Sequence, residues 1–136
     1  MSRQVDLESN VQRTDKIWWG IVALSGAAMV MLGAYAAHGL AARATEVMVS
    51  AVETGVRYHA WHTLAIMMVL VWHQVKPMAG QRWVMTLWAL GIACFSGSLY
   101  LMALAGLNIG IVTPIGGVLL MAGWLALAVV ALKANE

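Results

Sequence analysis

Long apolar stretches separated by short polar segments set the pattern of this chain. The four longest cover about residues 17–37, 59–75, 83–104 and 111–132, and none has Asp, Glu, Lys or Arg in its interior. Each approaches or exceeds the roughly 20 residues with which a helix crosses the hydrocarbon of a bilayer. The pattern therefore predicts an all-α membrane protein with four transmembrane helices.

The links between these stretches indicate how the helices follow one another. Residues 76–81 contain Pro77 and Gly80, and residues 106–110 begin and end with glycine, so both segments are typical of tight turns. Short links make successive helices antiparallel neighbours. We expect an antiparallel four-helix bundle over residues 17–136, preceded by a mobile polar tail, residues 1–16, in which apolar positions show no clear period.

The first link, residues 43–58, has a helical pattern of its own. Charged and polar side chains recur there at three- and four-residue steps and face an apolar stripe, and they are Arg43, Glu46, Ser50, Glu53 and Arg57. This spacing predicts an amphipathic helical segment between the first two spans. It either lies on the outer membrane surface or continues directly into the second span.

The charged residues predict the orientation of the chain. Eight basic and six acidic residues are present. With four spans, six of the basic residues fall on the side of the two termini, and they are Arg3, Arg13, Lys16, Lys76, Arg82 and Lys133. Because basic residues are retained in the cytoplasm, both termini are predicted to be cytoplasmic, with the lipid bilayer around the spans. No basic cluster interleaved with aromatic residues indicates nucleic-acid binding.

Polar residues gather in the outer halves of the predicted spans, where they form a candidate cofactor-binding set of His38, His59, His62 and Tyr100. Such a set would hold a small ligand, either a haem, a quinone or a metal. No carboxylate or cysteine joins the histidines at the same depth, so the sequence assigns no metal site. The alternative is that these side chains only make hydrogen bonds between helices, worth on the order of 0.6–2 kcal/mol each in membranes.

Features needed for common reactions are missing from the sequence. It shows no Ser/His/Asp arrangement, no glycine-rich phosphate loop and no carboxylate inside a predicted span. We therefore expect no enzymatic activity and no coupled transport, which usually buries acidic residues. The favoured function is a non-enzymatic accessory or structural subunit that packs against a larger membrane complex, with another membrane protein or a second copy as partner. The alternative is the small-ligand binder.

Four ordered motifs give the chain a family resemblance. They are the segments GAYAAHGL at 33–40, TGVRYHAWH at 54–62, FSGSLY at 95–100 and TPIGG at 113–117. With them the sequence resembles the YgdD-like family of small inner-membrane proteins, a domain of unknown function (423), and eukaryotic transmembrane protein 256-like proteins. The resemblance implies a four-helix multipass protein of the bacterial inner membrane. It implies no activity and no site residue.

Overall fold

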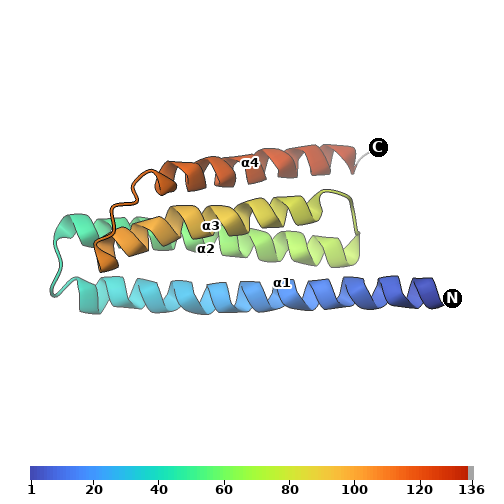
Figure 1. The fold of residues 1–136 in the computed structure, drawn as a ribbon, viewed down its shortest axis with the longest axis horizontal. Helices are drawn as coiled ribbons and strands as arrows, with labels where there is room; N and C mark the ends of the chain where they lie inside the picture. The colour runs from blue at the N-terminus through green and yellow to red at the C-terminus, as the bar shows by residue number, and fades with distance from the viewer. Residues whose placement is uncertain (135–136) are drawn as a thin grey trace.

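The structure is a computed structural model that describes residues 1–134, and within this range it contains helices and no strand. The elements are α1 (Ser2–Tyr35), the π-helical turn η1 (Ala36–Leu40), α2 (Glu46–Val75), α3 (Gln81–Ala105) and α4 (Val112–Lys133). The chain reverses direction at each connection, and α2 and α3 lie between α1 on one side and α4 on the other (Figure 1).

Packing follows the order of the chain. The main interfaces join α1 to α2, α2 to α3, and α3 to α4. Helix α2 has the largest set of buried side chains, among them Val52, His59, His62, Ile66 and Leu70. By contrast, Val22 is the one buried residue of α1. Helix α2 therefore lies at the centre of the described residues, and α1 is peripheral.

Three of the helices are long and apolar enough to cross a membrane: α1 with η1, α3 and α4. Helix α2 is not among them, because His59, His62 and His73 lower the hydropathy of its apolar stretch. The sequence-based count of four spans is thus supported for three helices. The remaining apolar stretch, residues 59–75, does form part of a helix, but it does not reach the hydropathy of the other three.

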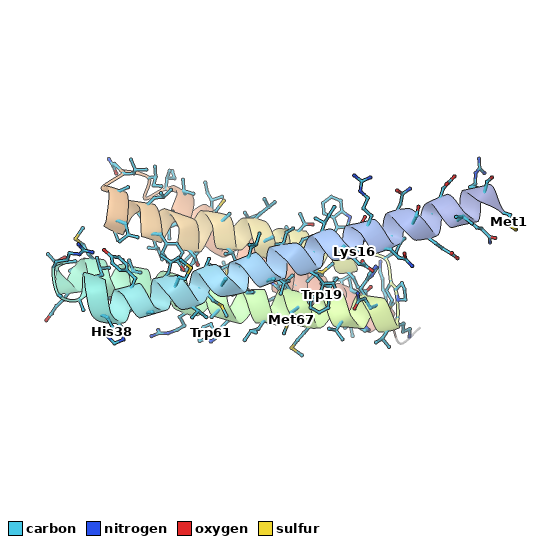
Figure 2. All side chains as sticks on the ribbon, turned by 90° about the horizontal axis from the view of Figure 1, so that it is seen from below. Met1, Lys16, Trp19, His38, Trp61 and Met67 are labelled. Atoms are coloured by element: carbon cyan, nitrogen blue, oxygen red, sulfur yellow. The ribbon has the colours of Figure 1, made fainter. Side chains whose placement is uncertain are left out.

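The N-terminal segment differs from the expected mobile tail. Helix α1 begins at Ser2 and runs without interruption to Tyr35, so the polar residues before Lys16 are helical. Figure 2 shows the start of α1, near Met1, projecting beyond the other helices. The segment is polar and exposed along most of its length, as predicted. It extends the first helix, however, and does not form an irregular N-terminal tail.

The amphipathic link also becomes part of a longer helix. Thr45 caps α2, because its hydroxyl accepts the N–H of Met48 at 3.3 Å. From Glu46 onward the helix continues through Tyr58 into the second apolar stretch. Of the two arrangements open from the sequence, the structure therefore has the continuous one, and Arg43 lies in the turn before the helix.

Glycines let α3 and α4 approach closely. A Cβ atom added to Gly116 would lie 2.6 Å from the Cα of Phe95 and 2.7 Å from the carbonyl carbon of Cys94. Gly123 likewise faces the indole of Trp88 with no room for a side chain. Small residues at such positions allow dispersion contacts along the backbones, which drive helix association in lipid.

Candidate functional site

His59 forms a polar junction between three helices. Its Nε2 lies 2.8 Å from the hydroxyl of Ser25 on α1, and its Nδ1 lies 3.0 Å from the hydroxyl of Tyr100 on α3. The Ser25 hydroxyl is also 2.7 Å from that of Thr63, one turn further along α2. Hydroxyl groups both donate and accept, so either neutral tautomer of His59 satisfies this network. We call these four residues the His59 junction.

A glycine makes room for the tyrosine of this junction. A Cβ atom on Gly55 would lie 2.8 Å from the ring of Tyr100. The carbonyl oxygen of Gly55 accepts a hydrogen bond of 2.7 Å from the hydroxyl of Ser96, which is fully buried. Helices α2 and α3 are thereby held together next to His59 by a contact that depends on the missing side chain.

His62 forms a second junction, directed toward α4. Its Nδ1–H donates to the carbonyl oxygen of Tyr58 at 2.7 Å, and its Nε2 accepts the indole N–H of Trp124 at 3.0 Å. A carbonyl oxygen only accepts and an indole N–H only donates, so these two bonds define a neutral imidazole with its proton on Nδ1. We call His62, Tyr58 and Trp124 the His62 junction.

The indole N–H groups of Trp88 and Trp124 both find hydrogen-bond acceptors inside the protein. The indole N–H of Trp88 donates to the carbonyl oxygen of Leu120 at 3.2 Å, and the rings of Trp88 and Trp124 are 4.7 Å apart. Tryptophan is usually enriched at membrane interfaces, where its N–H meets water. Here protein acceptors take that role, so the two rings can lie away from the helix ends.

The predicted cofactor-binding set is only partly brought together. His59 and Tyr100 are in direct contact, as the sequence predicts. His62 contacts Tyr58 and Trp124 instead of Tyr100. His38 lies on η1 with its side chain exposed, at the end of the molecule (Figure 2). The four residues therefore do not converge on one point.

The ligand chemistry of the two junctions is constrained by their hydrogen bonds. Both ring nitrogens of His59 and of His62 have protein partners, so a haem iron or other metal would have to displace one of them. Within residues 1–134 no three His, Cys, Asp or Glu side chains gather where they could hold a metal ion. Cofactor binding by His38, His59, His62 and Tyr100 stays a prediction.

A polar cluster at the opposite end of α2 was not anticipated. His73 donates from Nδ1 to the side-chain oxygen of Gln81 at 2.6 Å, and Gln81 is fully buried. A carboxylate oxygen of Asp15 lies 4.0 Å from Nε2 of His73 and 3.8 Å from the guanidinium of Arg82. No local pattern around Asp15 signals these contacts, because they depend on how α1 lies against the turn between α2 and α3.

An aromatic groove runs beside the His62 junction. It has a volume of about 660 Å³ and is lined by residues of α2, α3 and α4, among them Tyr58, Trp61, His62, Phe95, Gly117 and Trp124. The sequence alone does not predict this groove. Its walls come from three helices, and the aromatic residues look like ordinary apolar positions when each helix is considered alone.

The family model described as "Protein of unknown function (DUF423)" matches residues 32–117 of this chain. The chain belongs to that family. This confirms the resemblance that the four motifs indicate, and the matched residues include both histidine junctions apart from Ser25 and Trp124.

Several named relatives align over most of the chain. A "UPF0382 membrane protein" of Haemophilus influenzae is 40% identical over 85% of this chain and 94% of its own length. The "UPF0382 inner membrane protein YgdD" of Escherichia coli K12 is 41% identical over 82% of this chain and 86% of its own length. A relative from Staphylococcus haemolyticus is 38% identical over 74% of this chain and 83% of its own length. No solved structure shows a significant match.

These relatives are named membrane proteins, and three helices of this chain are suited to cross a bilayer. The protein is therefore integral to a membrane. None of the relatives' names states an activity, so any function has to be argued from the structure.

Proposed function

We propose that this protein is a non-enzymatic accessory or structural protein of the bacterial inner membrane, which packs through α1 against a larger membrane complex. The observation that carries the proposal is how little of α1 the protein itself covers. Only 6% of the most apolar stretch of α1 and η1 is buried, against 28% for α3 and 22% for α4. The inner-membrane location is supported by the name of the Escherichia coli relative.

The exposed face of α1 is shaped for contact with another helix. Small residues recur along it at intervals of three, four and seven residues, and they are Gly20, Ala23, Ala27 and Ala34. These intervals place them on one side of the helix. A Cβ atom on Gly20 would meet nothing within 4 Å. Faces of small residues let helix backbones approach closely in lipid, as α3 and α4 do in this protein.

The projecting start of α1 supports the same function. Val5 and Leu7 are exposed near the end of α1 that carries Met1, and this end projects beyond the other helices (Figure 2). Isolated helices of this length are marginally stable in water, and tertiary packing usually supplies the missing stability. A partner that covers both this segment and the small-residue face would supply that packing.

The proposed topology has four spans and two cytoplasmic termini. Helix α2 is included as the fourth span because it packs against both α1 and α3, and its three histidines are buried. Both ring nitrogens of His59 and His62, and Nδ1 of His73, are hydrogen-bonded inside the protein. Its first turns, Glu46 to Tyr58, form the amphipathic outer part, with Glu53 exposed and Val52 buried.

Reporter fusions test this topology. We expect a fusion to the C-terminus to be active with a reporter that works only in the cytoplasm, because most Lys and Arg residues lie on the side of the termini. A fusion in the turn after Leu40 should be active only with a periplasmic reporter. Periplasmic activity at the C-terminus would contradict the four-span arrangement.

A bulky residue on the small-residue face tests the docking function. We expect Ala27→Trp to release whatever membrane protein co-migrates with the wild type after gentle extraction, because the larger side chain separates the two backbones. The matched control is Ala128→Trp, at an equally exposed position of α4. Native electrophoresis with mass spectrometry measures the loss and distinguishes a different protein from a second copy. Equal behaviour of the two variants would argue against docking through α1.

A further inference from the structure

The groove beside the His62 junction is larger than a single cavity. A second hollow of about 320 Å³ lies next along α2 and α4, bordered by Ala65, Met68 and Trp72. The ring of Trp124 borders both hollows. From Tyr58 to Trp72 the two together extend for about 20 Å, given the rise of 1.5 Å per helical residue. The two hollows follow one another along the side of α2 that faces α4, and these two helices are not among the main packing partners; we call the two together the groove.

The position of the groove along the helices can be measured from the end of α3. Tyr58 precedes His59, and His59 contacts Tyr100, which is five residues before the end of α3 at Ala105. The first hollow therefore begins about 8 Å from that end of α3. The second hollow lies further toward the opposite end, where α2 finishes at Val75. An amphipathic molecule in the groove would have its head beside Tyr58 and its tail toward Trp72.

The lining of the two hollows suits an uncharged aromatic ligand. The residues that line the two hollows include no Asp, Glu, Lys or Arg. A phosphate head would need cationic partners, so the groove does not favour a phospholipid. Aromatic rings surround the first hollow: Tyr58 packs edge-to-face on Trp61 and on Phe95, with ring centroids 5.1 and 4.9 Å apart. Such surfaces bind another flat ring well.

Hydrogen-bond donors are available at the same end. The hydroxyl of Tyr58 and the indole N–H of Trp61 are neutral donors on two side chains that line the first hollow. The nitrogens of His62 are already engaged by Tyr58 and Trp124, so His62 does not contact a ligand head but fixes the position of Trp124. Two neutral donors beside aromatic rings suit a carbonyl oxygen.

From this combination we propose that the groove binds one molecule of a lipid-soluble quinone. Its carbonyl-bearing ring lies among Tyr58, Trp61 and Phe95 and accepts a hydrogen bond from Tyr58, and its apolar tail follows the groove past Trp124 toward Trp72. This site is separate from the His38, His59 and Tyr100 positions, and it does not depend on docking through α1.

The test uses decylubiquinone, a quinone with a short tail, and purified full-length protein in one detergent. Quenching of tryptophan fluorescence should saturate, because Trp61 and Trp124 line the site. Gly117→Leu places a side chain in the groove, where a Cβ atom meets only Phe95 at 3.9 Å, and should weaken binding by about tenfold or more, equivalent to roughly 1.4 kcal/mol. Tyr58→Phe should weaken binding roughly two- to tenfold, the range for one hydrogen bond.

The matched control is Gly26→Leu on α1, where an added Cβ meets nothing within 4 Å, and it should bind like the wild type. If Gly117→Leu does not fold, Met121→Trp at the exposed rim of the groove replaces it. Quenching that rises linearly without saturation would mean partition into the micelle and overturn the site. Loss of the saturable quenching when decane is added at the same concentration as decylubiquinone would overturn recognition of the ring.

Discussion

Gly116→Ala is expected to lower the thermal stability of this protein more than any other single methyl addition. The added Cβ would meet backbone atoms of Phe95 and Cys94 on α3, and backbone cannot move aside as the end of a flexible side chain can. Overpacking of this kind typically costs about 1–3 kcal/mol and occasionally more. Because α3 and α4 share one of the main interfaces, the two helices have to separate along their length. Thermal unfolding in a single detergent measures the effect.

The next residue supplies the control for this experiment. Gly117→Ala makes the same chemical change one position along α4, but its Cβ would meet only the ring edge of Phe95, at an ordinary 3.9 Å. We expect a melting temperature close to that of the wild type. If the two variants unfold at the same temperature, α3 and α4 are not packed as closely as the structure has them.

His59→Ala is expected to produce the second large effect. The substitution removes a partner of both Tyr100 and Ser25 and so removes one of the polar contacts that join α1 and α3 to the centre of α2. A buried polar group left without a partner costs about 1–3 kcal/mol. Ser25 keeps Thr63 as a partner, so most of the loss should come from Tyr100. A double-mutant cycle with Tyr100→Phe would measure the coupling between His59 and Tyr100.

Substitutions of two other histidines serve as comparisons for the loss of stability in His59→Ala. His38→Ala should leave the melting temperature unchanged, because the side chain is exposed on η1. His73→Ala should cost less than His59→Ala, because the oxygen of Gln81 keeps the N–H of Met78 as a donor at 2.8 Å. A protein that tolerates His59→Ala but not His38→Ala would show that the His59 junction does not hold the helices together.

The sequence alone determines the apolar helices, because each needs only a local property of the chain, but it does not predict the polar start of α1 at Ser2. Apolar stretches without charge predict helices in a membrane protein, and Thr45 before Glu46 has the side chain that caps one. Depth is also local, since counting residues from the ends of the predicted spans places His59 and Tyr100 at the same level of the bilayer. The amphipathic pattern of residues 43–58 likewise indicates a helix, although it leaves open whether that helix is separate.

Only the tertiary structure decided which neighbour each polar side chain meets. His59 and His62 differ by about 60° around α2, so a small rotation directs one to α1 and α3 and the other to Trp124 on α4. The π-helical turn around His38 changes the direction in which side chains point, compared with what an α-helical residue count predicts.

Asp15 meets His73 and Arg82 only because α1 continues as a helix past the turn that follows α2. The groove between α2 and α4 has no local signal either, since it is the space left between helices that are not neighbours in sequence. Local periodicity determines where helices form, whereas their rotation and lateral order depend on contacts between residues far apart in the chain.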